Sequence, residues 1–405
     1  MTATNRDELA GKLKGLDASS PLYATQFIEL LLEASRQAGA SDLHLNPTER
    51  GLLAQWRIDG VLAPVGEFSR GQAADVVTRL KVLAGLLTYR TDTPQEGRLR
   101  PETAGGGLSE TSGAAGSVEI RVSTFPTLHG ERAAVRLFAP ESQYSYLADL
   151  QLPGEIEEAL GKLLHETSGA ILLTGPAGSG KTTTAYACLR EIVRASGGRR
   201  NVVTLEDPIE VAMAGVSQSQ VNPAAGFSLA TGLRSLMRQD PEVILVGEIR
   251  DLETAQTVIQ AALTGNLVIS TFHAGSAAAA VSRLLDMQIE PYLLTSSLIA
   301  VLHQRLLRRL CTCADAAEGK SKKRGGGCEL CRSTGYRGRL AAAELLPPLS
   351  GALAQAVLQW RDRAELHRIA RELGMTTIGE RAQVAIHSGQ TDLEEVRRVL
   401  GLVDE

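Results

Sequence analysis

A short glycine-rich segment, GPAGSGKT, has the residue types and spacing needed to hold a polyphosphate. Its glycines allow successive backbone N–H groups to turn toward phosphate oxygens, and the positive end of a following helix adds to the attraction. We expect Lys181 to reach the β- and γ-phosphates and the Thr182 hydroxyl to ligate Mg²⁺. The predicted nucleotide-binding residues are Gly175, Pro176, Ala177, Gly178, Ser179, Gly180, Lys181, Thr182 and Thr183.

Two acidic residues downstream of this loop indicate what happens to the nucleotide. Glu206 ends the apolar run in TLEDPIE, and Glu248 ends the apolar run EVILVG, where it is placed to hold Mg²⁺ directly or through water. One carboxylate can bind the metal, directly or through water, while the other orients and deprotonates an attacking water. Either residue alone is interpreted more simply as a solvated glutamate at a strand end, but the two together favour hydrolysis.

The elements around these residues alternate between strands and helices. Apolar strands are predicted at AILLT, NVVTL, EVILVG and LVIST, and helices are predicted to begin at Lys181 and Leu252. Strands separated by helices indicate a parallel, doubly wound sheet. The glycine-rich loop therefore lies between a strand and a helix, as phosphate binding requires.

The chain of 405 residues exceeds what one ordinary core supports, so we expect more than one domain. Ahead of the doubly wound part, a helix is predicted to end at Gly39, and Asp59-Gly60 predicts a tight turn between two strands. Residues 104–117 are rich in glycine and serine and are predicted to be a flexible hairpin tip. The predicted divisions are a flexible tail at 1–20, an α+β domain at 21–145, a nucleotide-binding domain at 146–348 and a helical subdomain at 349–405.

Arginines gather in the segment RVSTFPTLHGERAAVRLF, within the predicted α+β domain. Arg121, Arg132 and Arg136 fall on two short predicted strands joined by a turn at 128–130. Planar guanidinium groups suit the oxygens of a phosphate that gains negative charge during transfer. An alternative for each arginine is a surface or interdomain ion pair, and for Arg132 this is the favoured interpretation.

Four of the five cysteines lie between residues 311 and 331, which indicates a metal site more than a disulfide framework. Cys328 and Cys331 form a C-x₂-C half-site, and Cys311 and Cys313 form C-x-C. Four thiolates can satisfy tetrahedral Zn²⁺ at about 2.3 Å each. The alternative is a degenerate site with reduced, unligated thiols.

Composition limits where the protein works. The net charge is -4, with a sequence pI near 6.1, so there is no global attraction to nucleic acid. No apolar run approaches the roughly 20 residues needed to cross a bilayer, and the start has no signal-peptide core. We expect a cytoplasmic protein.

The longest motifs resemble successive boxes of the type II secretion and type IV pilus assembly ATPases. They are GPAGSGKTTT, TLEDPIE, VNPAAGFSLATGLRSLMRQDPEVILVGEIRD and TGNLVISTFHAG. The resemblance continues upstream in SDLHLNP, WRIDGVL and RVSTFPTLHGER and downstream in QRLLRRLC, GYRGR and GMTTIGE. It extends from about residue 21 to near the end of the chain.

This resemblance implies a fold and a set of roles. The fold is an N-terminal α+β (PAS-like) sheet domain followed by a RecA-like ATPase domain with a cysteine-rich insertion and a C-terminal helical appendage. Glu206 matches the catalytic acidic box and Glu248 the second acidic box, whereas His273 matches the histidine box. The implied arginine fingers are Arg121, Arg136 and, third, Arg98. The sequence departs from the family at Asn266, where a histidine is usual, and after His273, where AGS replaces TND.

The resemblance implies a hexameric motor that hydrolyses ATP with Mg²⁺ and drives assembly of a pilus or pseudopilus. Its implied partner is a platform protein of the inner membrane, and its location is the cytoplasm, peripheral to that membrane. One alternative is a retraction-type or other RecA-like motor, including a DNA translocase, although acidic charge and few aromatic residues argue against nucleic acid. Another is a nucleotide-binding scaffold with little hydrolysis.

Overall fold

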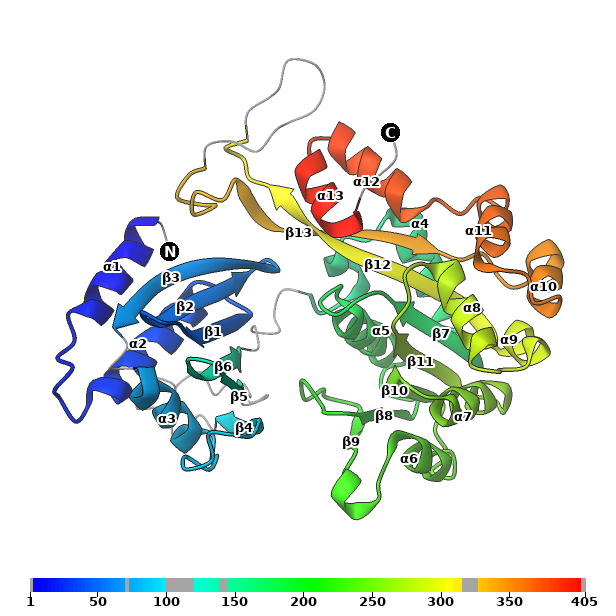
Figure 1. The fold of residues 1–405 in the computed structure, drawn as a ribbon. Helices are drawn as coiled ribbons and strands as arrows, with labels where there is room; N and C mark the ends of the chain where they lie inside the picture. The colour runs from blue at the N-terminus through cyan, green and yellow to red at the C-terminus, as the bar shows by residue number, and fades with distance from the viewer. Residues whose placement is uncertain (1–2, 70–72, 100–119, 138–143, 315–326, 402–405) are drawn as a thin grey trace. The chain divides into compact units, whose positions relative to one another are not determined.

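The computed structural model describes residues 3–69, 73–99, 120–137, 144–314 and 327–401. The hairpin tip predicted at 104–117 lies outside these residues. The chain divides into two compact units, each with its own sheet (Figure 1). The first unit contains residues 1–140 together with 311–315 and 324–338, and the second contains the remainder.

The sheet of the first unit has six strands in the order β3-β2-β1-β6-β5-β4, paired antiparallel. The strands are β1 (Asp42–Pro47), β2 (Gly51–Ile58), β3 (Val61–Ser69), β4 (Gln95–Leu99), β5 (Ile120–Thr127) and β6 (Gly130–Arg136). The predicted tight turn is confirmed: Asp59 and Gly60 separate β2 from β3, with φ angles of 48° and 81°. Both residue types tolerate such angles at low cost.

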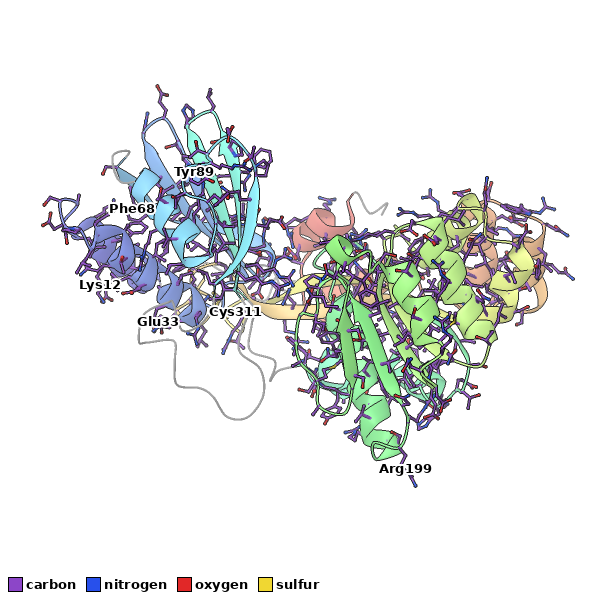
Figure 2. All side chains as sticks on the ribbon, turned by 90° about the horizontal axis from the view of Figure 1, so that it is seen from below. Lys12, Glu33, Phe68, Tyr89, Arg199 and Cys311 are labelled. Carbon is purple, nitrogen blue, oxygen red and sulfur yellow. The ribbon has the colours of Figure 1, made fainter. Side chains whose placement is uncertain are left out.

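Helices α2 (Tyr23–Gln37) and α3 (Ala73–Leu83) contribute apolar faces to the core of this unit. The Phe27 ring packs edge to face on Phe68 of β3, with centroids 4.9 Å apart. Phe68 is labelled in Figure 2. The structure differs from the sequence prediction over the first residues, because helix α1 (Ala3–Lys14) occupies much of the expected tail. Leu9 and Leu13 are buried, and their spacing of four residues places both on one helical face.

The second unit contains the predicted parallel sheet. Its seven strands run in the order β13-β12-β7-β11-β10-β8-β9, and the pairs from β12 to β9 are parallel. The strands are β7 (Gly169–Thr174), β8 (Val202–Glu206), β9 (Ser217–Gln220), β10 (Val243–Ile249), β11 (Leu267–Phe272), β12 (Leu298–Leu310) and β13 (Tyr336–Leu345).

Helices cover both faces of this sheet, as a doubly wound fold requires. Ala170 and Leu172 of β7 pack with one layer, which includes α7 (Leu252–Leu263) and α8 (Ala277–Asp286). The alternate residues of β7 pack with the other layer, which includes α4 and α5. The remaining helices are α4 (Gly154–Leu163), α5 (Lys181–Ser196), α6 (Leu229–Leu236), α9 (Pro291–Ser297), α10 (Gly351–Leu358), α11 (Arg363–Glu372), α12 (Ile378–His387) and α13 (Leu393–Leu400), with 3₁₀ turns at Leu147–Leu150 and Pro223–Ala225.

The last helices pack against the long strands at the sheet's edge. Leu307 of β12, Leu340 of β13 and Val396 of α13 share a small apolar cluster. Beside it, the buried Glu395 carboxylate lies 2.7 Å from the Arg308 guanidinium. In the described part of the chain, no helix combines the length and the apolar character needed to cross a membrane.

Candidate active site and metal centre

The glycine-rich loop joins β7 to α5, where sequence analysis places it. Gly175 has a φ of 145°, and a side chain there would meet the Ser179 hydroxyl at 2.5 Å and the Gln304 carbonyl at 2.6 Å. Gly178 and Gly180 also have positive φ angles, of 74° and 89°. Only glycine satisfies both the angle and the space at Gly175, so the loop can fold tightly over the start of α5.

Lys181 begins α5 and bends back over the loop. Its Nζ donates to the backbone carbonyls of Gly175 and Pro176, at 2.9 Å each. Burial lowers the pKa of this amine, and nearby Arg305 lowers it further, whereas Glu248 opposes the shift. The next residue, Thr182, is half-buried in the first turn of the helix. The roles of Lys181 in phosphate binding and of Thr182 in Mg²⁺ binding stay predictions.

Gln304 of β12 supports the loop from behind. Its Nε2 donates to the Ser179 carbonyl at 2.7 Å, and its Oε1 accepts from the Thr184 hydroxyl at 3.0 Å. One side chain thus ties the loop to the first turns of α5. Sequence analysis missed this residue because no local pattern links it to a loop more than a hundred positions earlier.

Glu206 and Glu248 lie on neighbouring parallel strands at their carboxyl ends. Leu205 pairs with Val246 in the sheet, and a side chain at Gly247 would lie 3.3 Å from the Glu206 Cα. The Glu206 carboxylate is buried and accepts from the Tyr186 hydroxyl and, at 2.6 Å, from the Thr204 hydroxyl. The two predicted acids therefore lie on adjacent strands, at the carboxyl edge of the sheet.

His273 links Glu248 to the glycine-rich loop. Its Nε2 lies 2.9 Å from the Glu248 carboxylate, and its Nδ1 lies 3.1 Å from the Gly175 carbonyl. Both ring nitrogens therefore face oxygen atoms. Arg250 also donates to Glu248, at 2.9 Å. The loop, His273 and the second acid form one connected group.

The three predicted finger arginines form a row across the sheet of the first unit. Arg98 of β4 pairs with Arg121 of β5, which in turn pairs with Arg136 of β6. Directly paired residues project from the same face of a sheet. Arg98 and Arg136 are exposed, and Arg136 lies 3.3 Å from the Asp42 carboxylate. Their reach to a nucleotide remains a prediction.

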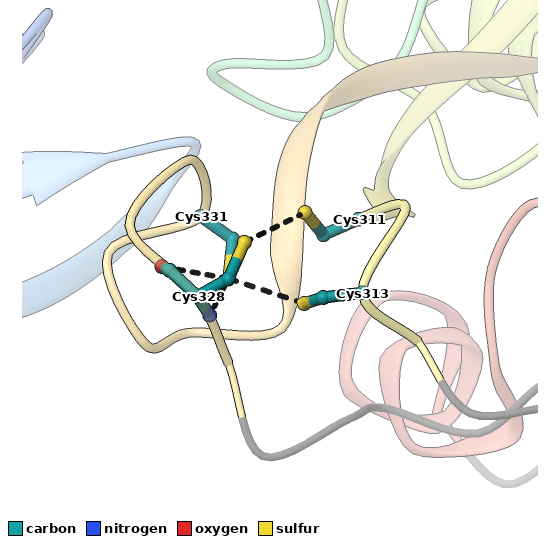
Figure 3. Close-up of side chains that lie close together, drawn as sticks. All are labelled: Cys311, Cys313, Cys328 and Cys331. Atoms are coloured by element: carbon teal, nitrogen blue, oxygen red, sulfur yellow. Dashed lines mark hydrogen bonds between the residues drawn. The ribbon is translucent and has the colours of Figure 1, made fainter.

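The four clustered cysteines converge on one point, as Figure 3 shows. Their sulfur atoms all lie within 4.8 Å of one another, with Cys311 3.7 Å from Cys328 and Cys313 3.6 Å from Cys331. A tetrahedral zinc with bonds of about 2.3 Å would hold its sulfur ligands about 3.8 Å apart. The thiols thus fit a zinc ion despite the C-x-C spacing.

The environment of Cys331 also suits a metal ligand. Its burial raises the thiol pKa, but N–H groups of Cys328 and Gly335, at 3.1 and 3.3 Å, and the neighbouring thiols lower it to about 7. Metals bind the thiolate form, so donors that favour this form favour ligation. Cys188 is fully buried on α5, apart from the cluster.

Comparisons with known proteins agree with these features. The family described as type II/IV secretion system protein matches residues 18–398. The type II secretion system protein HxcR of Pseudomonas aeruginosa is 40% identical over 384 residues, which cover 95% of this chain and 79% of that protein. The type IV pilus assembly ATPase PilB of Thermus thermophilus is 35% identical over 412 residues, which cover 96% of this chain and 45% of that protein.

A solved structure extends the likeness to three dimensions. The pilus retraction motor PilT with bound ADP superposes with a TM-score of 0.62 at 25% identity, covering 93% of this chain and 97% of that chain. The predicted resemblance is confirmed over nearly the whole chain. The chain belongs to the type II/IV secretion system protein family.

Proposed function

We propose that this chain works as a homohexameric motor whose ATP hydrolysis powers assembly of a pilus or pseudopilus. The chain is an ATPase of the secretion and pilus-assembly kind, as its family and relatives establish. The observation that carries the proposal is a glycine-rich loop joined to Glu248 through His273, with Glu206 on the strand next to that of Glu248.

In the proposed mechanism, the N–H groups of residues 175–180 and the amine of Lys181 bind the phosphates. Lys181 exchanges its two loop carbonyls for phosphate oxygens, which are stronger acceptors. Thr182 and Glu248 are the residues that would hold Mg²⁺, which supplies charge neutralisation at the phosphates. Glu206 orients a water molecule and takes its proton.

His273 acts as a positioning residue for Glu248 in this proposal. It contacts both the Glu248 carboxylate and the Gly175 carbonyl, so a change at the loop reaches the acid directly. The guanidinium groups of Arg121, Arg136 and Arg98 stabilise the charge that grows on the γ-phosphate. In GTPases such a group accelerates the reaction by roughly 10³- to 10⁵-fold.

Two structural details extend the proposal. We assign the first unit to a PAS-like fold, because an antiparallel six-stranded sheet packs with helices in one core.

We also assign Zn²⁺ to the cysteine cluster, on the grounds of its sulfur spacing. The ion would stabilise the segment that joins β12 to β13, because this segment is too polar to form a hydrophobic core of its own.

The proposed setting is the cytoplasmic face of an inner membrane. The partner there is an integral platform protein, turned by nucleotide-driven motion of the motor's domains. Relatives named for type II secretion and for type IV pilus assembly support this setting.

The test is steady-state ATP turnover of the parent and of Glu206→Gln. Loss of the general base should lower kcat by about 100-fold or more, because such groups contribute 10²- to 10⁴-fold. Glu158→Gln is the matched control, since Glu158 is an exposed helix residue paired with Lys162 and should leave turnover unchanged. Equal rates for the parent and Glu206→Gln would contradict the assigned base, and near-background rates for both would indicate a nucleotide-binding scaffold.

A further inference from the structure

We propose that Tyr186 is a positioning residue for Glu206, holding the catalytic carboxylate from the helix that follows the phosphate loop. This inference rests on the proposed role of Glu206 as the general base and adds a residue that sequence analysis did not single out. The contact joins two parts of the site that are twenty positions apart in the sequence.

The direction of this hydrogen bond is fixed by a second contact. The backbone N–H of Glu210 donates to the Tyr186 hydroxyl oxygen at 3.2 Å. That N–H occupies a lone pair of the phenol, so the phenol's own proton is directed at the Glu206 carboxylate. Burial and the negative charge of Glu206 raise the pKa of Tyr186, which keeps the proton on the hydroxyl.

The other oxygen of the carboxylate has partners from the sheet. Thr204 donates to Glu206 Oε1 at 2.6 Å, and the Gln218 amide of β9 donates to the same oxygen at 3.3 Å. Gln218 is itself oriented, because its Oε1 accepts from the Met213 N–H at 2.7 Å. Tyr186 is therefore the donor that ties Glu206 to α5, whereas Thr204 and Gln218 tie it to the strands.

Because Tyr186 lies on α5, its hydrogen bond couples the position of this helix to the Glu206 side chain. Lys181 and Tyr186 are five residues apart on this helix, a rise of about 7.5 Å. A movement of α5 when the loop closes on phosphate therefore moves the Tyr186 hydroxyl and, with it, the Glu206 side chain. Rates depend steeply on the placement of a general base, and errors of about 1 Å can cost 100-fold.

The experiment compares ATP turnover of the parent, Tyr186→Phe and the control Tyr292→Phe. Phenylalanine keeps the buried ring and removes only the hydroxyl, and Tyr292 is an exposed tyrosine on α9. We expect kcat of Tyr186→Phe to fall by roughly 10- to 100-fold, the effect of losing one hydrogen bond to a charged group, with KM for ATP within about twofold. Tyr292→Phe should match the parent.

A double variant tests whether Tyr186 acts through Glu206. We expect Tyr186→Phe to have no further effect on kcat in the Glu206→Gln background, because residues that act as a unit are not additive. The same fall in both backgrounds, or a parental kcat for Tyr186→Phe, would overturn the inference. A fall in kcat/KM through KM alone would overturn it too.

The two proposals fail in different ways. If Glu206→Gln loses activity and Tyr186→Phe does not, the role of Tyr186 is wrong and the proposed base stands. If Glu206→Gln keeps the parental rate, the proposed base is wrong and this inference falls with it.

Discussion

Each charged side chain of the candidate site has a polar partner within the protein. Lys181 binds the loop's own carbonyls, Glu248 binds His273, and Glu206 binds Tyr186. Buried polar groups need partners, and these contacts supply them. In the proposed mechanism, phosphate oxygens replace the two backbone carbonyls as acceptors for Lys181.

A buried histidine beside the loop predicts a pH dependence of stability. His303 of β12 lies 3.2 Å from the Thr174 hydroxyl at the end of β7. Burial, with the charges of Arg305 and Lys181, lowers its pKa to about 4. In the unfolded chain a histidine titrates near 6.5, so between about pH 6.5 and 4 the unfolded state binds the extra proton. Stability should therefore fall as pH falls through this window, by at most about 3 kcal/mol.

The measurement is the thermal midpoint of the parent and of His303→Gln between pH 7.5 and 5. The midpoint of the parent should drop more steeply toward low pH, because glutamine has no proton to gain. Parallel curves for the two proteins would show that His303 does not contribute to the slope.

At this scale the sequence predicted the residues that follow directly from local pattern. Lys181, Glu206 and Glu248 each come at the end of a strand or glycine-rich loop, and the structure places Glu206 and Glu248 on neighbouring strands and Glu248 near Lys181. The roles of Gln304 and Tyr186 in the site were not predicted, because a glutamine on a strand or a tyrosine on a helix occurs in many structural contexts. Their roles depend on contacts between segments distant in the sequence.

At the scale of elements, the phosphate loop contacts β12 through Gln304 and continues directly from β7. The predicted strands and helices between residues 169 and 272 were identified by apolar runs bounded by turn residues, and their alternation gave the parallel sheet. Strand β12 was not predicted, since its arginines interrupt the apolar run. Arg308 is tolerated there because Glu395 of α13 neutralises it, a pairing that no local pattern reveals.

The cysteine segment is a second case in which contacts between distant parts of the chain could not be predicted from local sequence. Sequence order places it inside the ATPase domain, whereas residues 311–315 and 324–338 group with the first unit. Within that unit Arg332 donates to the Ala38 carbonyl beyond the end of α2, and Gly338 donates to Asp59 at 3.3 Å. Chain order alone cannot anticipate such contacts across nearly three hundred positions.

Loss of one thiol tests the metal assignment. Cys331→Ser should reduce bound zinc from about one ion per chain to well below half, and it should lower the thermal midpoint, because metal binding contributes folding free energy. Cys188→Ala is the control, since this buried cysteine lies outside the cluster and its removal should leave the zinc content unchanged. Elemental analysis of purified protein gives the result, and a parent with little zinc would contradict the assignment.

At the scale of the whole molecule, we propose that arginines of the first unit act on a nucleotide held by the second unit of a neighbouring subunit. Arg98, Arg121 and Arg136 form one row in which Arg136 is paired with Asp42, and a further anion opposite the row would reduce the repulsion among the three charges. In a hexamer the anion is proposed to be the triphosphate of a neighbouring subunit. Single Arg121→Ala and Arg136→Ala substitutions should then lower ATP turnover severely while leaving the thermal midpoint nearly unchanged.

The most direct measurement mixes two inactive proteins, Arg121→Ala and Glu206→Gln, and follows ATP turnover after subunit exchange. Mixed rings would contain sites in which an intact Glu206 meets an intact Arg121 from the adjacent subunit. We expect turnover well above the sum of the two separate proteins. Turnover equal to that sum, in mixtures shown to have exchanged subunits, would contradict an arginine acting across the subunit boundary.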